Sequence, residues 1–212
     1  MLKFSFEKAK NLLLLGAHSD DIEIGCGGTV LRLTAANPDL NILWVVFSAE
    51  GARRREARSS ARLFLEAVGQ SKMVLKQFRS SFFFTQGEPI KQYFETLKRS
   101  FNPDIVFTHY RDDRHQDHRL ISDLAWNTFR DHLILEYEVP KYDGDLGIPN
   151  LFVPLDEAIC RRKVSHLSKA FRSQRDKHWF SEETFLGLMR LRGVECASQY
   201  AEAFHCRKMV CG

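Results

Sequence analysis

Short, continuously apolar runs recur along the chain and alternate with longer segments in which apolar residues follow a helical period. The apolar runs predict buried strands at residues 12–15, 42–47, 73–75, 105–108 and 133–137. The longer segments predict helices at residues 27–36, 53–68, 90–101, 120–132, 163–175 and 182–192. This order predicts an α/β fold: a Rossmann-like, three-layer arrangement of a mostly parallel sheet with helices on both faces. Since no segment has the composition of a linker, residues 1–212 are expected to form a single domain.

Two clusters of imidazole and carboxylate side chains follow predicted strands. The clusters consist of His18, Asp20 and Asp21, and of His115, Asp117 and His118. The first comes directly after the strand at 12–15, and the second comes a few residues after the strand at 105–108. Because α/β proteins bind ligands beyond the carboxyl ends of their parallel strands, we expect the two clusters to meet at one edge of the sheet.

The chemistry of these side chains favours zinc. Zinc binds imidazole nitrogen and carboxylate oxygen, and a catalytic site uses three protein ligands and keeps a position for water. The clusters offer more side chains than that, and the surplus suits general acid–base and electrophilic roles. Magnesium is less suited, because imidazole is a poor ligand for it. Two other interpretations stay open: Asp20 and Asp21 could simply place negative charge at a helix start, and residues 115–118 could belong to an exposed charged loop.

The composition limits the classes of function. A chain with 44% hydrophobic and 27% charged residues is typical of a globular protein, and its net charge of +4 is mild. The tightest basic group is Arg53–Arg55, followed by Glu56 and Arg58. Such a group is more typical of a solvated helix face or an anion-binding corner than of a nucleic-acid patch, so no nucleic-acid partner is expected.

Neither a leader nor a membrane anchor is expected. The N-terminus lacks the pattern of a signal peptide, and no apolar stretch approaches the roughly 20 residues of a membrane span. The five cysteines form no CxxC pair, and their odd number argues against a complete disulfide framework. Reduced thiols in the cytoplasm are the simplest interpretation.

The two clusters belong to motifs that resemble those of a known family. Ala17-His18-Ser19-Asp20-Asp21 and His115-Gln116-Asp117-His118 are similar to the motifs of the PIG-L/LmbE-like family of zinc-dependent N-deacetylases. The first motif of that family is His-Pro-Asp-Asp, and Ser19 takes the place of its proline here. Other segments look like family segments and follow in the expected order: Gly25–Thr29, Arg53 with Glu56, Asn102–His109, Ser173-Gln174 and Tyr200–Phe204. The resemblance therefore extends over most of the chain.

The resemblance implies a role for each member of the two clusters. It implies one zinc ion per chain, with the ligands His18, Asp21 and His118. Asp20 would be the general base. His115 would stabilise the developing oxyanion or protonate the leaving amine, and Asp117 would orient the His115 ring.

The resemblance also implies a substrate-binding pair. Glu50 and Arg53 would contact sugar hydroxyls or a phosphate, although Arg53 could equally pair with Glu56 on the helix surface. Related sequences often have an acidic residue near Ser80 and a histidine near Arg172. These two departures would alter the substrate pocket.

Together these features predict a hydrolase that removes an N-acetyl group from an amino sugar or an N-acetylglucosamine conjugate. The expected partner is that small-molecule substrate, and homo-oligomer formation is left open. The alternative is a non-catalytic sugar- or nucleotide-binding protein on the same scaffold. The altered pocket positions favour this alternative, while the complete set of ligand and base residues argues against it.

Overall fold

A single twisted sheet of seven strands forms the centre of the computed structural model, which describes residues 3–6 and 8–210. The strand order is β3-β2-β1-β4-β5-β7-β6. The strands are β1 (Asn11–Gly16), β2 (Asn41–Val46), β3 (Gln70–Leu75), β4 (Ile105–His109), β5 (Leu133–Tyr137), β6 (Leu151–Leu155) and β7 (Tyr200–His205). Strands β1 to β5 pair in parallel, while β7 pairs antiparallel with both β5 and β6. The prediction of a mostly parallel sheet is therefore confirmed.

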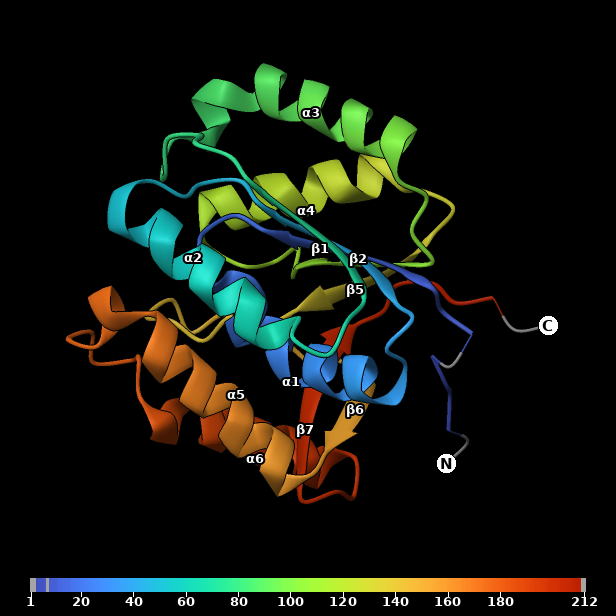
Figure 1. Cartoon of the computed structure of the whole chain (residues 1–212), viewed down its shortest axis with the longest axis vertical. Helices are drawn as coiled ribbons and strands as arrows, with labels where there is room; N and C mark the ends of the chain where they lie inside the picture. Colours follow the sequence, from blue (N-terminus) through green and yellow to red (C-terminus); the bar gives the residue numbers. More distant parts are fainter. Residues whose placement is uncertain (1–2, 7, 211–212) are drawn as a thin grey trace.

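Helices cover both faces of the sheet (Figure 1). They are α1 (Asp21–Ala36), α2 (Gly51–Phe64), α3 (Gly87–Ser100), α4 (Gln116–Thr128), α5 (Glu157–Ala170) and α6 (Glu182–Glu195), with short 3-10 turns η1 (Phe83–Gln86) and η2 (Arg172–Gln174). Because side chains alternate along a strand, Leu12 and Leu14 of β1 pack in the core beneath α1, α2, α5 and α6. Leu13 and Leu15 pack in the opposite core, beneath α3 and α4. The three-layer α/β class predicted from the sequence is thus the observed one.

Two strands were missed by the sequence prediction, and each has a reason. The run Tyr200–His205 is not continuously apolar, because Glu202 lies within it, yet this carboxylate is buried. Strand β6 contains Pro154, which a strand tolerates at a sheet edge, and β6 is an edge strand. Both strands extend the sheet beyond β5.

Helix starts differ from the predicted ones in a way that matters for the chemistry. Helix α1 begins at Asp21 rather than near Gly27 or Gly28, and α4 begins at Gln116 rather than at Leu120. Asp21 of the first cluster and Asp117 and His118 of the second therefore lie in the first turns of these helices. Polar first turns escape a prediction based on apolar periodicity, because their side chains face the sheet edge instead of the core.

The four described cysteines, Cys26, Cys160, Cys196 and Cys206, are all free, whereas Cys211 lies outside the described residues. Among the helices of residues 3–6 and 8–210, none is both long and apolar enough to cross a membrane.

The glycine-rich start of α1 allows close packing. A Cβ atom added to Gly25 would lie only 2.1 Å from Cδ2 of Tyr137, a fully buried side chain on β5. The Tyr137 hydroxyl donates a hydrogen bond to the Leu15 carbonyl at 2.6 Å, which fixes this ring against β1. Glycine at position 25 is therefore required by the space that the tyrosine ring occupies.

We expect Gly25→Ala to lower the free energy of unfolding by about 1–3 kcal/mol, because the new methyl group overpacks the core against Tyr137. The matched control is Gly187→Ala on α6, where an added Cβ meets nothing within 4 Å. That substitution should raise stability by about 0.5–1 kcal/mol through helix propensity alone. Urea denaturation of both variants checks the pair, and equal effects would contradict the packing argument.

Candidate metal centre

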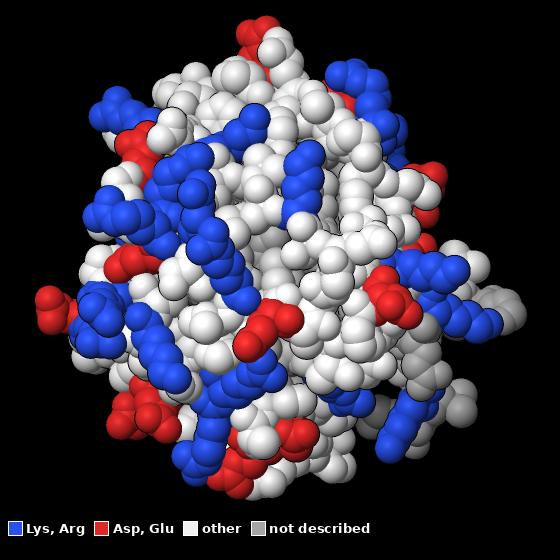
Figure 2. Space-filling model, viewed as in Figure 1, with Lys and Arg blue, Asp and Glu red and all other residues white. Residues whose placement is uncertain are grey.

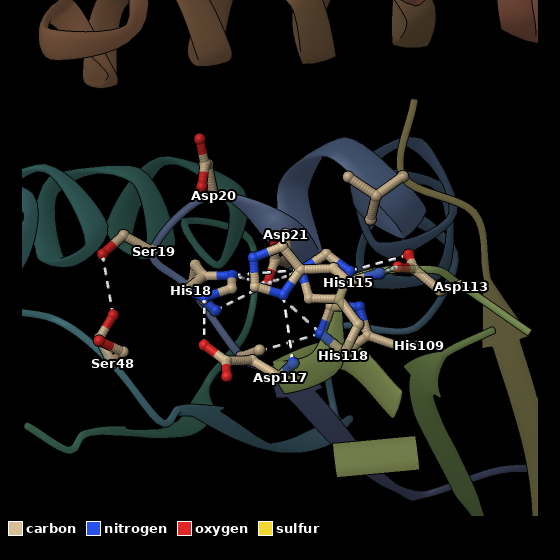
Figure 3. Close-up of polar contacts among 12 residues, drawn as sticks. His18, Ser19, Asp20, Asp21, Ser48, His109, Asp113, His115, Asp117 and His118 are labelled. Carbon is tan, nitrogen blue, oxygen red and sulfur yellow. Dashed lines mark hydrogen bonds and ion pairs between the residues drawn. The ribbon is translucent and has the colours of Figure 1, made fainter. Parts of the chain in front are cut away.

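The polar clusters meet at the carboxyl ends of β1 and β4, which are neighbours in the sheet (Figure 3). His18 lies in the connection from β1 to α1, and Asp21 is the first residue of α1. His115 caps the N-terminus of α4, and His118 is in the first turn of that helix. The sequence prediction that the two clusters would come together is confirmed by this geometry.

Three donor atoms of the predicted ligands lie at nearly equal separations. The Nδ1 atom of His18 is 3.1 Å from Nε2 of His118 and 3.4 Å from Oδ2 of Asp21. The Nε2 atom of His118 is 3.5 Å from the same Oδ2. Ligands bound tetrahedrally to zinc at 2.0–2.1 Å lie about 3.3 Å from one another. The three atoms thus have the spacing of one face of a zinc tetrahedron, and the donor set fits this metal.

Each of the two imidazoles is backed by a carboxylate through its other ring nitrogen. Asp113 Oδ2 lies 2.8 Å from Nδ1 of His118, and Asp117 Oδ2 lies 3.1 Å from Nε2 of His18. Such pairs fix the orientation and tautomer of a metal-binding imidazole. The prediction for Asp117 was wrong in its partner: its carboxylate orients His18, not His115. The reason is that Asp117 faces back toward β1 from the first turn of α4, where it also accepts the amide protons of Ser81 and Phe83.

The backbone at Ser81 supports this arrangement. Ser81 has a φ of 67°, in the left-handed region that non-glycine residues rarely adopt. Its amide nitrogen lies 2.6 Å from Oδ2 of Asp117. The segment between β3 and α3 therefore takes a strained conformation to place a donor on the carboxylate that orients His18.

His109, at the end of β4, was not singled out as a site residue by the sequence prediction. Its ring is fully buried and stacks on His118 with 3.9 Å between ring centroids. Donor atoms of Asp21, His109 and His118 lie within 4.8 Å of one another, as do those of His18, His115 and His118. However, Nε2 of His109 accepts the amide proton of Ala17 at 2.9 Å, so its lone pair is engaged. We therefore regard His109 as packing behind the donor set; the only signal in the sequence was its place at a strand end.

The charge states of the imidazoles differ. Burial lowers the pKa of His18, but Asp21 and Asp117 outweigh it and raise this pKa to about 10. Burial and the neighbouring His109 lower the pKa of His118 to about 4, despite the opposing effect of Asp21. Burial would raise the pKa of Asp21, yet the surrounding imidazoles hold it well below its usual range. Without a metal ion, the donor set therefore holds a proton on His18 and negative charge on Asp21.

His115 has a different environment from the one expected for a proton donor. Its Nδ1 accepts the backbone N–H of Asp117 at 3.2 Å, which makes the ring the N-terminal cap of α4. Burial and the charge of His18 lower its pKa. The ring is thus a hydrogen-bond acceptor at Nδ1, and its Nε2 atom is the one that can carry a proton.

Asp20 is held by Arg53 rather than by the histidines. Its Oδ1 atom lies 2.6 Å from Nη2 of Arg53, and its carboxylate points away from the imidazole cluster (Figure 3). Burial raises the pKa of Asp20, with Arg53 opposing this effect. Arg53 also lies 3.4 Å from Glu56 and 3.5 Å from the Ser173 hydroxyl, so the pairing with Glu56 is observed.

The remaining predicted positions lie at the surface. Glu50 occupies the N-cap position of α2, but its exposed side chain makes no capping hydrogen bond. Ser80 and Arg172, the two positions that depart from related sequences, are also exposed. None of these three side chains takes part in the donor set described above.

Comparison with known proteins identifies the family to which this site belongs. The fold and the His–Asp–His donor set define an α/β protein with a candidate metal centre at the sheet edge. The family model of PIG-L, GlcNAc-PI de-N-acetylase, matches residues 13–129, which is just over half of the chain. The chain belongs to this family of deacetylases.

One relative and two solved structures extend the comparison. The chain is similar to the uncharacterized deacetylase YaiS of Escherichia coli K12, with 29% identity over 180 residues that cover 78% of this chain and 92% of YaiS. It resembles N,N'-diacetylchitobiose deacetylase from Pyrococcus horikoshii with a TM-score of 0.72 and 20% identity, over 95% of this chain and 85% of that one. It also resembles GalB, the 4-carboxy-2-hydroxymuconate hydratase of Pseudomonas putida KT2440, with a TM-score of 0.74 and 16% identity, over 96% and 98% of the two chains. At identities of 20% and 16%, these two similarities support the fold alone.

We expect Asp113→Asn to weaken zinc binding by about 10- to 100-fold, because the amide no longer holds the His118 ring as a carboxylate does. The matched control is Asp112→Asn at the neighbouring exposed position, which should leave the affinity unchanged. Competition with a chelating dye measures both dissociation constants. Equal affinities of the two variants would show that Asp113 does not orient the ligand.

Proposed function

We propose that this protein is a zinc-dependent hydrolase that removes an N-acetyl group from an amino sugar or an N-acetylglucosamine conjugate. The observation that carries the proposal is the set of three donor atoms, on His18, Asp21 and His118, with 3.1–3.5 Å between them. They would hold one zinc ion per chain. When bound, zinc polarises an amide carbonyl and lowers the pKa of a water molecule.

The residues around the donor set can divide the remaining work of amide hydrolysis. Asp20 would take a proton from the attacking water. Arg53, whose Nη2 lies 2.6 Å from Oδ1 of Asp20, would hold this carboxylate in place. The Nε2–H group of His115 would donate a hydrogen bond to the developing oxyanion, and the proton taken up by Asp20 would pass to the leaving amine. Asp117 and Asp113 would keep the two imidazole ligands oriented.

An amino-sugar substrate is supported by the family and by the edge of the site. The family model carries the name of a GlcNAc-PI de-N-acetylase, and the structure from Pyrococcus horikoshii is that of a diacetylchitobiose deacetylase. Arg53 lies beside Asp20 and has 27% of its side chain exposed. Glu50 is exposed and lies at the start of α2. We propose that these two side chains bind sugar hydroxyls or a phosphate of the substrate.

Three further proposals concern the domain organisation, the cellular location and the partners of the protein. We propose that the chain acts as a single domain, because one sheet includes strands from both halves of the sequence. A cytoplasmic location is supported by the free thiols of the four described cysteines. No nucleic-acid partner is proposed.

The second candidate is a non-catalytic sugar- or nucleotide-binding protein. The ion pair between Asp20 and Arg53 favours it, since the proposed base is already occupied. The likeness to the hydratase GalB also shows that this fold alone does not select amide hydrolysis. Binding of an N-acetylated sugar by the zinc-loaded protein without any acetate release would favour this second candidate.

Zinc binding near neutral pH is expected to release about one proton per chain, because the ligand must lose the proton that His18 holds with a pKa of about 10. His118, with a pKa of about 4, should release none in this range. Above a pH of about 10 the release should vanish, since His18 is then already neutral. Titration calorimetry in two buffers of different ionisation enthalpy measures the number, and identical enthalpies in both buffers would contradict the assignment.

Loss of the proposed base is expected to reduce acetate release strongly. Asp20→Asn should lower kcat by about 10²- to 10⁴-fold while the zinc content stays at one ion per chain, because general base catalysis is lost and the ligands remain. Acetate release should be measured on free, lipid-linked, nucleotide-linked and inositol-linked N-acetylglucosamine. Asp39→Asn, at an exposed position in the turn between α1 and β2, is the control that should keep full activity. Undiminished turnover by folded Asp20→Asn protein would remove Asp20 from the mechanism.

A further inference from the structure

Helix α1, which starts with the metal-ligand candidate Asp21, is not a regular helix. Cys26 has φ −140° and ψ 15°, so the helix is interrupted between its first turn and the segment that follows. In a regular helix the Gly28 amide would donate to the Ile24 carbonyl and the Thr29 amide to the Gly25 carbonyl. An interruption here weakens such bonds inside the core, where unpaired polar groups are costly.

A buried ion pair occupies this interruption. One carboxylate oxygen of Glu202 accepts the Gly28 amide at 2.8 Å, and the other accepts the Thr29 amide at 2.6 Å. The ammonium group of Lys163 lies 2.7 Å from Glu202 and donates to the Ile24 carbonyl at 2.6 Å. The ion pair therefore provides hydrogen-bond partners on both sides of the break in α1. Lys163 binds the Ile24 carbonyl before the break, and Glu202 binds the Gly28 amide after it.

The charges lie where solvent does not screen them. Each of the two side chains is only 3% exposed. A buried ion pair holds a defined geometry only if its remaining donors and acceptors are also satisfied, and here the backbone of α1 supplies these partners. The position of the first turn of α1 relative to the rest of the helix is thus tied to two charged side chains.

These side chains come from distant parts of the fold. Lys163 is on α5 and Glu202 is on β7, and both elements pack against α1 (Figure 1). Both residues lie beyond the segment 13–129 that the family model matches. The C-terminal part of the chain therefore reaches back to the helix that begins with Asp21.

We propose that Lys163 and Glu202 are positioning residues of the metal centre: their ion pair sets the place of the first turn of α1 and with it the carboxylates of Asp20 and Asp21. The inference rests on the proposed function in one respect, since the positioned carboxylates are those assigned to zinc and to the base. It assigns a task to two residues, on α5 and β7, that lie outside the proposed donor set.

The test replaces both charges together. Lys163→Met combined with Glu202→Gln leaves no unpaired buried charge, so this protein is expected to fold, whereas either single substitution would leave one. The matched control is Arg192→Met combined with Glu138→Gln. That pair is also buried, at 2.6 Å, but it joins α6 to the segment after β5 and makes no bond to α1.

Two measurements distinguish positioning from a merely structural role. The zinc dissociation constant, measured by competition with a chelating dye, should rise about tenfold or more in the test protein and stay within about twofold in the control. Amide hydrogen exchange of residues 18–25 should accelerate about tenfold in the test protein only. Both proteins are compared at a temperature where each is fully folded.

The outcomes separate this proposal from the proposed function. An unchanged zinc dissociation constant in the folded test protein, whatever its melting temperature, would overturn the positioning role, and so would equal weakening in the control. If the unaltered protein takes up no zinc, the proposed function fails by itself. Exchange at residues 18–25 then decides: acceleration confined to the test protein supports the positioning of this turn, and equal rates in the two proteins refute it.

Discussion

The parallel pairing of β1 with β4 is the constraint on which the candidate metal centre depends. Leu12, Leu13 and Leu14 pair with Ile105, Val106 and Phe107, so the two strands end at the same edge of the sheet. The connections that leave these strands carry His18 and Asp21 on one side and His115 and His118 on the other. An order of strands in which β1 and β4 were not neighbours would separate the donor atoms, since no single segment of the chain supplies all of them.

The donor set also shows how the fold handles buried charge. Asp21 is surrounded by imidazoles, and Asp113 and Asp117 each lie against one of them. Lys141 and Asp145, from the segment after β5, extend this arrangement, because Lys141 lies 3.0 Å from Asp113. Charges are thus compensated in pairs before any metal ion binds, and a divalent cation would replace the proton on His18.

Basic side chains gather over α2 and α5 on the outer surface (Figure 2). Arg53 begins this region at the site, where it contacts Asp20, Glu56 and Ser173. On α5, Arg161 pairs with Glu157 and Arg162 with Glu66, so part of the positive charge is neutralised locally. This pattern agrees with the expectation of a solvated helix face.

The sequence by itself determined the α/β class, the five parallel strands and the two clusters that meet at the sheet edge. It could do so because a buried parallel strand is a continuous apolar run, and because chemistry in this class lies beyond strand ends. The resemblance to a family motif then implied His18, Asp21 and His118 as zinc ligands, and the donor atoms of these three residues have the spacing of a zinc site.

Only the tertiary structure decided which partner each polar side chain has. Asp117 orients His18 instead of His115, Asp113 backs His118, and Arg53 holds Asp20. The sequence also did not predict strands β6 and β7. Nor did it predict the ion pair of Lys163 with Glu202 at the break in α1. The physical reason is the same in each case: a hydrogen bond or ion pair depends on the direction of a side chain across elements far apart in the chain, and periodicity along one segment carries no information about that direction.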